Sequence, residues 1–321
     1  MTTTSPRVSV IMPCFNEAQR LPASVGSVAN QTFKDFELIV VDDGSQDNSL
    51  DVLTDLAAQY PFLRFFAQEN RGAGAARNKG LKEARGEYIA FLDADDTWHP
   101  DCLLKLYSKL SSTPDAVLVY CGWQNIGVDA GRAKPFVPPD YENEQKIETL
   151  LRGCRWPIHA ALTRKDAIDK AGGFDEQWSS CMDYDLWLRV ASKGKIVRVP
   201  EVLAYYHHHE GEQITKNRAR IAINHYLIQK KYVKENPGIE RRLGEDKIKE
   251  IIEGEHLHQA YVCYWDRDLK ASHILFRRVF AGGSYKKQDL RYLLPALLPY
   301  PVYRALIRFI DRVGFLRERR S

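Results

Sequence analysis

The sequence predicts an α/β protein built on a mainly parallel, doubly wound sheet and followed by a helical C-terminal region. Over the first half of the chain, short runs rich in β-branched and aromatic residues alternate with segments of helical spacing. Such alternation favours parallel strands whose connecting helices cover both faces of a sheet. From about residue 215 the pattern is helical to the end. We therefore expect two domains, residues 1–212 and 213–321.

The individual elements follow from composition and spacing. The expected strands are RVSVIM (7–12), FELIVVDD (36–43), FLRFFAQ (62–68), EYIAFLDA (87–94), AVLVYCG (116–122) and KIVRVPEVLAYYHHH (195–209). Helical periodicity or helix caps place helices at about 17–30, 47–59, 74–85, 100–111 and 182–193. Residues 122–142 are rich in glycine, proline and charge, and we expect a long loop there.

Composition excludes several classes of protein. The 46 basic and 42 acidic residues give a net charge of only +4, which is too balanced for a nucleic-acid partner to be expected from bulk charge. The six cysteines show no CxxC or metal-type spacing, which favours free thiols in a reducing compartment. The N-terminus has no signal-peptide pattern, and no apolar run reaches the roughly 20 residues of a spanning helix. We therefore expect a cytoplasmic protein.

Polar clusters follow three of the expected strands. They are Pro13 to Glu17 after the first strand, Asp42 and Asp43 after the second, and Asp93 to Asp96 after the fourth. In an open parallel sheet, ligands bind beyond the carboxyl ends of the strands. The three clusters are therefore expected to converge on one edge of the sheet.

The third cluster carries three carboxylates within four positions. Asp93, Asp95 and Asp96 repel one another unless a cation, a basic neighbour or solvent compensates their charge. Asp93 and Asp95 have a spacing that can hold a divalent cation through oxygen ligands. Taken alone, the D-x-D tripeptide is a weak signal, because a solvated acidic turn explains most isolated occurrences.

The segment GAGAAR (72–77) has some features of a dinucleotide-binding loop. It carries Gly72 and Gly74, but Arg77 stands where the third glycine of that fingerprint would be. A Rossmann-type cofactor is therefore disfavoured.

Four linked motifs resemble the family-2 glycosyltransferases of the GT-A fold. They are VSVIMPCFNE, QTFKDFELIVVDDGSQDNS, NRGAGAARNKGLKEARGEYIAFLDADDTWHPDCL, and GGFDE followed by MDYDLWLRVASKG. Together they cover about residues 7–210, in order and with fitting gaps. The resemblance implies transfer of a sugar from a nucleotide-diphosphate donor, most commonly a UDP-sugar, to a glycan or lipid-linked acceptor. The basic, apolar C-terminus points to a lipid-linked or other membrane-bound glycan acceptor, as in surface polysaccharide or glycoconjugate assembly. The long loop expected at 122–142 is a candidate lid over the acceptor.

The resemblance also assigns the donor site. It implies a nucleotide pocket formed by Pro13, Phe15, Asn16, Glu17, Asp43, Asn70, Gly72, Arg77, Asp93 and Ala94. Asp43 is expected to contact the base, while Asp42 shapes the turn. Asp95 would be the main ligand of Mg²⁺ or Mn²⁺, with Asp96 able to substitute. Arg77 either contacts donor phosphate or pairs with an aspartate.

The histidine triplet 207–209 closes the last strand. The resemblance makes His209 a candidate ligand of the metal or the diphosphate, and a strand-end histidine that only packs is the alternative. Trp156 and His159 lie where relatives shape the acceptor pocket, although a core position is the default for a tryptophan.

Asp183 is the candidate general base. In a helix it shares a face with Leu186 and Trp187, whereas Asp185 is expected to point away. Partial burial raises a carboxylate pKa towards a range suited to accepting a sugar hydroxyl proton. The alternative is a first-turn acid that binds backbone N–H groups. The resemblance implies single displacement with inversion, but Met182 replaces the glutamate that many relatives carry before this aspartate.

Other interpretations stay open. The tail combines an apolar helical face (Tyr303, Leu306, Ile307, Ile310, Val313) with Arg304, Arg308 and Arg312. Such a helix either makes peripheral contact with an anionic membrane or packs on the protein body with a solvated basic edge. For the whole protein, the alternatives are a binding module that has lost catalysis and a sugar nucleotidyltransferase. Nucleotidyltransferases hold triphosphate in a glycine-rich loop after the first strand, and this sequence has no such loop there.

Overall fold

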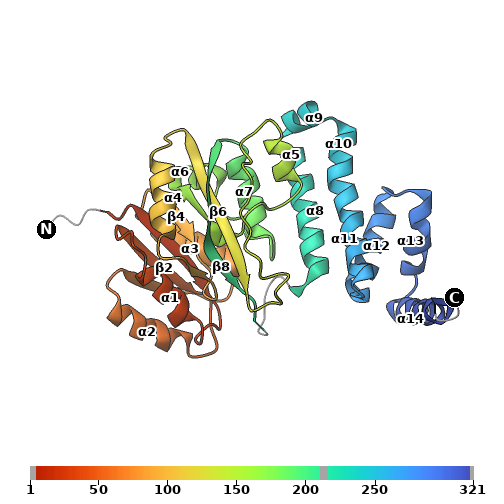
Figure 1. Cartoon of the computed structure of the whole chain (residues 1–321), viewed down its shortest axis with the longest axis horizontal. Helices are drawn as coiled ribbons and strands as arrows, with labels where there is room; N and C mark the ends of the chain where they lie inside the picture. The colour runs from red at the N-terminus through yellow and green to blue at the C-terminus, as the bar shows by residue number, and fades with distance from the viewer. Residues whose placement is uncertain (1–4, 210–215, 319–321) are drawn as a thin grey trace. The chain divides into compact units, whose positions relative to one another are not determined.

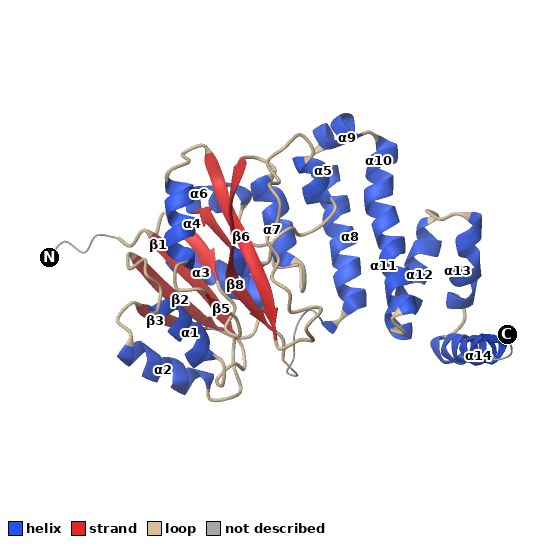
Figure 2. Cartoon of the chain, viewed as in Figure 1, coloured by secondary structure: helices blue, strands red, loops and turns tan. Residues whose placement is uncertain are grey.

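The computed structural model describes residues 5–209 and 216–318. The chain divides into two compact units, Met1–Gly211 and Glu212–Ser321. Within the described residues, all the strands belong to the first unit and the second unit is helical (Figure 2).

The first unit is built on an eight-stranded sheet of order β3-β2-β1-β4-β7-β6-β8-β5 (Figure 1). Its strands are β1 (Val8–Cys14), β2 (Phe36–Asp42), β3 (Leu63–Ala67), β4 (Tyr88–Phe91), β5 (Thr97–Trp98), β6 (Ala116–Ile126), β7 (Ala161–Arg164) and β8 (Lys195–His207). The strands β3, β2, β1 and β4 run parallel to one another, and β6 runs parallel to β8. This confirms the predicted α/β sheet.

Two short strands were not expected from the sequence. β7 runs antiparallel to both β4 and β6, and β5 runs antiparallel to β8, so the complete sheet is mixed. With two and four residues, these strands are too short to show a clear alternation of apolar and polar residues.

Helices alternate with the strands along the chain and pack on the sheet. They are α1 (Leu21–Ala29), α2 (Ser49–Gln59), α3 (Ala73–Glu83), α4 (Cys102–Ser111), α5 (Lys146–Leu151), the 3₁₀ helix η1 (Ile158–Ala160), α6 (Lys165–Ala171) and α7 (Met182–Ala191). The five predicted helices are confirmed. All seven residues of β2 are buried, as expected for a strand covered on both faces.

The predicted loop at 122–142 begins later than expected, because β6 continues to Ile126. Trp123 and Phe136 form an isolated antiparallel bridge, with N···O distances of 3.0 and 2.8 Å. This bridge ties the segment after β6 back onto that strand.

The second unit consists of helices around its own core. They are α8 (Arg218–Glu235), α9 (Pro237–Leu243), α10 (Glu245–Lys249), the π-helix η3 (Glu250–Gly254), α11 (Glu255–Trp265), α12 (Leu269–Gly282), the 3₁₀ helix η4 (Lys287–Asp289), α13 (Leu290–Ala296) and α14 (Tyr300–Glu318). Leu275, Phe276 and Leu293 lie at the centre of the core. Within residues 5–209 and 216–318, no helix has the length and apolarity needed to cross a bilayer.

Helix α14 packs by the apolar face that the sequence indicates. Tyr303 and Ile307 are buried in the core of the second unit. Arg304 and Arg308 are exposed, as is Phe309. Ile310, which the sequence assigns to the apolar face, is also exposed, so only part of that face is packed. For Tyr303 and Ile307 the packing alternative is therefore confirmed, while the side chain of Val313 lies outside the described part of the chain.

Candidate active site

The three polar clusters converge at the carboxyl ends of β1, β2 and β4. The backbone N–H of Asp43 donates to the carbonyl of Cys14 at 2.8 Å, and that of Leu92 donates to the carbonyl of Ile11 at 3.1 Å. These bonds continue the parallel pairing beyond the strands and hold the following loops side by side. The convergence predicted from the strand order is therefore present.

A group of three potential metal ligands lies at this edge. One ligand atom each of Glu17, Asp95 and His209 falls within 4.8 Å of the other two. His209 Nε2 lies 3.0 Å from Asp95 Oδ2, while His209 Nδ1 is buried without a hydrogen-bond partner. Two carboxylates and an imidazole with an unused ring nitrogen are a donor set that fits a divalent cation.

Glu17 belongs to this group, although the sequence assigns it to the nucleotide pocket. Burial raises its carboxyl pKa, the hydrogen bond from Arg20 opposes that rise, and the nearby charge of Asp95 adds to it. The Arg20 Nη1 to Glu17 Oε2 distance is 2.7 Å. The role of Glu17 depends on the loop after β1 lying close to the segment after β8, for which the sequence carries no local signal.

Asp93 is paired with Arg77. Arg77 Nη2 lies 2.5 Å from Asp93 Oδ1, and the guanidinium is buried. The same guanidinium donates to Met182 Sδ at 3.1 Å and lies over the Phe174 ring. Arg77 therefore pairs with an aspartate, and its contact with donor phosphate stays a prediction.

Asp96 turns into the interior, so the expectation that it could replace Asp95 as a ligand is wrong. Its side chain is fully buried, with Oδ2 3.0 Å from His159 Nδ1 and Oδ1 accepting from the His207 N–H at 2.9 Å. Burial raises the pKa of Asp96 to about 6, and the His159 charge opposes this rise.

Two residues that the sequence places near the acceptor lie in the core. His159 is fully buried against Asp96. Trp156 is buried and stacks on Tyr120 with a centroid distance of 4.5 Å. The default interpretation of Trp156 as a core residue is confirmed.

The nucleotide-binding candidates form a connected set of loops. Asp43 is buried, and its carboxylate accepts from the backbone N–H groups of Arg71 and Gly72 at 2.9 and 2.7 Å. Asp42 shapes its turn, as predicted, by accepting from Ser45 N–H at 3.1 Å. Asp43 therefore orders the loop at 70–72, and its contact with a base stays a prediction.

Asn16 supports the loop after β1. Its backbone has a positive φ of 56°, a conformation that asparagine tolerates better than most residues. Its side-chain oxygen accepts from Gln46 N–H at 2.7 Å. The other candidates lie along the same edge: Phe15 and Asn70 are exposed, Pro13 is half-buried in β1, and Ala94 is buried.

Each histidine of the triplet has a different partner. His207 Nε2 lies 2.8 Å from Thr97 Oγ1, and His208 Nε2 lies 3.0 Å from Asn125 Oδ1. His209 alone faces the carboxylates of the metal-ligand group. Burial lowers the pKa of His207 and of His208.

Asp183 lies in the first turn of α7. Cys154 Sγ donates to Asp183 Oδ2 at 3.7 Å, a contact that the sequence did not indicate. Burial raises the pKa of Asp183, while backbone N–H groups of the helix start and the charge of Arg77 oppose that rise. The carboxylate therefore combines the two alternatives, because it is both a first-turn acid and a group whose pKa burial raises.

Asp185 does not point away from the protein, so that prediction is wrong. It is buried, and its Oδ2 lies 2.5 Å from Arg189 Nη2, one helical turn away. Arg189 also donates to the Gly173 carbonyl at 2.8 Å. Asp185 therefore anchors α7 to the segment before it.

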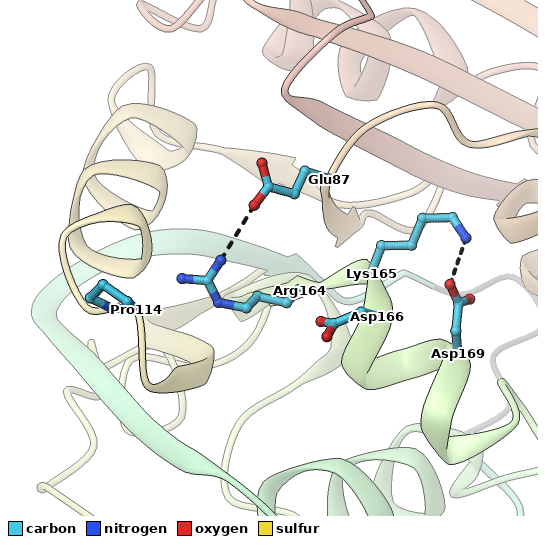
Figure 3. Close-up of a pocket in the computed structure, with 6 residues that line it drawn as sticks. All are labelled: Glu87, Pro114, Arg164, Lys165, Asp166 and Asp169. Carbon is cyan, nitrogen blue, oxygen red and sulfur yellow. Dashed lines mark hydrogen bonds and ion pairs between the residues drawn. The ribbon is translucent and has the colours of Figure 1, made fainter.

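A shallow pocket lies at the other end of β4, away from these residues (Figure 3). It is lined by Glu87, Pro114, Arg164, Lys165, Asp166 and Asp169. Four of its charged residues form two pairs, with Arg164 3.5 Å from Glu87 and Lys165 2.8 Å from Asp169, while Asp166 pairs with Lys170 outside the pocket lining. Because Glu87 precedes β4 while Asp93 follows it, this pocket is not part of the candidate site.

Comparisons with known proteins agree with this architecture. Residues 9–171 match the family described as Glycosyl transferase family 2. An uncharacterized glycosyltransferase of Rickettsia typhi is 31% identical over 236 residues, covering 70% of each chain. A cholesterol galactosyltransferase of Borreliella burgdorferi is 34% identical over 165 residues, covering 50% of this chain and 45% of the relative.

Solved structures share the fold across most of the chain. TarS 1–349 of S. aureus, in complex with UDP-GlcNAc, has a TM-score of 0.64 at 20% identity and covers 96% of this chain and 92% of its own. The mannosyltransferase PcManGT of Pyrobaculum calidifontis, in complex with GDP-Man and Mn²⁺, has a TM-score of 0.56 at 20% identity, with 98% and 87% covered. The chain therefore belongs to glycosyl transferase family 2 and is a glycosyltransferase of the GT-A fold.

Proposed function

We propose that this glycosyltransferase is metal-dependent and inverting, and that it uses a nucleotide-diphosphate sugar, with UDP-sugars as the first expectation. The observation that carries the proposal is the grouping of Glu17, Asp95 and His209 at the carboxyl edge of the sheet. The proposed acceptor is a glycan or a lipid-linked saccharide in surface polysaccharide or glycoconjugate biosynthesis.

On the donor side, Glu17, Asp95 and His209 would hold Mg²⁺ or Mn²⁺. A cation bound there would neutralise the charge that develops on the leaving diphosphate. The nucleotide would lie along the loops ordered by Asn16 and Asp43. Relatives of the same fold differ in the base, since TarS was solved with UDP-GlcNAc and PcManGT with GDP-Man.

On the acceptor side, Asp183 would accept the proton of the attacking hydroxyl. Its raised pKa brings the carboxylate closer to the range in which proton transfer from a hydroxyl is effective. The neighbouring carboxylates have other partners: Asp93 is held by Arg77, and Asp185 by Arg189. Asp183 is therefore the carboxylate best suited to be the base, and single displacement with inversion needs no second one as nucleophile.

The surface of the second unit supports the proposal that the protein reaches a lipid-linked acceptor at a membrane. Several large apolar side chains of α13, the following turn and α14 are exposed; they are Leu294, Leu297, Leu298, Val302, Phe309 and Ile310. Arg304 and Arg308 are exposed on α14 beside them. Apolar side chains next to arginines suit peripheral contact with an anionic bilayer.

Vesicle binding tests this contact. Phe309 is 65% exposed, so Phe309→Glu should leave the fold intact and weaken sedimentation with vesicles containing anionic lipid. Leu104→Glu, an exposed leucine on α4 in the first unit, is the matched control and should bind vesicles as the wild type does. Equal binding by wild type and Phe309→Glu would remove the membrane proposal without affecting the donor site.

Calorimetry of UDP and GDP, with and without Mn²⁺, tests the donor site. The metal-dependent part of nucleotide binding should disappear in Asp95→Ala. It should persist in Asp115→Ala, which removes an exposed carboxylate that pairs with Lys195 at the surface. Failure of UDP, GDP and dTDP to bind in the presence of metal would overturn the proposal.

Turnover is tested next, by nucleotide release from a panel of sugar nucleotides with candidate acceptors. Release that depends on Asp183 supports catalysis. Metal-dependent binding with no turnover on any donor and acceptor would favour the alternative, a nucleotide-binding module without activity.

A further inference from the structure

Asp96 and His159 form a fully buried pair beside the candidate metal ligands, and the proposed chemistry does not use them. Both side chains are 0% exposed, and His159 Nδ1 lies 3.0 Å from Asp96 Oδ2. Removing two such groups from water is costly, and an isolated buried pair adds little stability by itself. The position of the pair therefore calls for a reason other than stability.

The Asp96 carboxylate joins two distant parts of the chain. Its Oδ1 accepts from the backbone N–H of His207 at 2.9 Å, while Oδ2 faces His159. Asp96 follows Asp95 directly, and His207 lies two residues before His209. One carboxylate thus links the backbone that carries Asp95 to the backbone that carries His209.

Neighbouring contacts strengthen the same link. Thr97 pairs with Tyr205 between β5 and β8, and its hydroxyl lies 2.8 Å from His207 Nε2. Trp98 Nε1 donates to the His159 carbonyl at 2.7 Å. The loop after β4, the end of β8 and the 3₁₀ helix η1 therefore meet at Asp96.

We propose that Asp96 and His159 are positioning residues, which hold Asp95 and His209 at the separation that a divalent cation requires. The inference rests on the proposed metal-dependent function. Groups behind metal ligands commonly fix their orientation, and their loss typically weakens metal binding by about tenfold to a hundredfold. Asp96 would do so through backbone and loop placement, because it is buried away from the cation itself.

The test compares nucleotide affinity with saturating Mn²⁺ and with EDTA, using the full chain and whichever of UDP or GDP the wild type binds. The ratio of the two affinities measures the contribution of the metal. Asp96→Ala should lower this ratio by about tenfold or more and leave the affinity in EDTA unchanged. Asp96→Asn keeps an acceptor for the His207 N–H, so its affinity ratio should fall less than that of Asp96→Ala. It also serves as the test variant if Asp96→Ala does not fold.

Glu37→Gln is the matched control for the loss of a buried ion pair. Glu37 is a buried β2 residue that pairs with Arg64 at 2.7 Å, at the opposite end of the sheet. The Glu37→Gln substitution should lower the melting temperature and leave the contribution of the metal to nucleotide affinity unchanged. The positioning role is overturned if folded Asp96→Ala or Asp96→Asn keeps the wild-type ratio, or if Glu37→Gln lowers the ratio equally.

Failure of the metal site and failure of the positioning role give different results. If the wild type binds nucleotide equally with Mn²⁺ and with EDTA, the metal site and the positioning role fall together. If the wild type and Asp95→Ala differ while Asp96→Ala matches the wild type, the positioning role alone is wrong.

Discussion

Carboxylates lie close together in sequence both in the loop after β4 and in the first turn of α7. In each place one acid is buried with a basic partner, Asp96 with His159 and Asp185 with Arg189. Asp95 and Asp183 are less buried. Asp95 belongs to the metal-ligand group, and Asp183 is contacted by Cys154. Asp93, the third acid after β4, is paired with Arg77. Of neighbouring aspartates, one therefore has a structural role and another is available for catalysis or metal binding. The position of the buried basic partner determines which aspartate has the structural role.

The two places differ in the origin of that partner. Arg189 lies one turn beyond Asp185 on the same helix, at the i, i+4 spacing. His159 comes from η1, far from Asp96 in sequence. The helix pair is therefore a local anchor, while the loop pair connects separate segments of the fold.

The largest expected effect separates Asp183 from Asp185. If Asp183 is the base, Asp183→Asn should lower the rate of nucleotide release in the presence of acceptor by about a hundredfold to ten-thousandfold. Its affinity for Mn²⁺ and nucleotide should stay near that of the wild type. A folded Asp183→Asn with wild-type turnover would assign the base elsewhere.

Asp185→Ala should act on stability. It leaves the largely buried Arg189 guanidinium without its carboxylate, which costs about 3 kcal/mol in free energy of unfolding. Urea denaturation of Asp185→Ala and of Asp169→Ala, which removes an exposed carboxylate paired with Lys165, measures the difference. Equal midpoints for the two variants would contradict an anchoring role for Asp185.

The raised pKa of Asp183 predicts the acid side of the pH profile. The base must be ionised, so turnover should fall about tenfold per pH unit once the pH drops below that pKa. Stability responds in the opposite sense, because an acid whose pKa is raised on folding destabilises the native state as the pH rises through that value. In Asp183→Asn, the residual turnover should lose this acid limb, and an unchanged limb would assign it to another group.

Cys154 is expected to give the smallest effect. Its thiol lies 3.7 Å from Asp183 Oδ2 and 3.1 Å from the Trp156 carbonyl oxygen, so its contact with Asp183 is the longer of the two. Cys154→Ser offers a stronger donor to the ionised carboxylate, which should lower the pKa of Asp183 and move the acid limb of the profile slightly to lower pH. Turnover at neutral pH should change by less than about threefold, and a shift to higher pH would contradict the contact.

The α/β architecture, most of the strands and helices, and the edge of the sheet at which the site lies could all be predicted from local sequence patterns. These follow from the periodicity of apolar residues and from the rule that parallel strands end at one edge, both of which act over short stretches of chain. The linked motifs also pointed to the family before any geometry was known.

Which carboxylates are available for chemistry depends on packing between distant segments of the chain. The tertiary structure buried Asp96 against His159, paired Asp93 with Arg77, turned Asp185 inward and brought Glu17 to Asp95 and His209. Most of these contacts join residues from different strands, loops or helices, so no local pattern encodes them. Two carboxylates that are adjacent in sequence have the same intrinsic chemistry. They take different roles because the fold places different cations, or solvent, next to each of them.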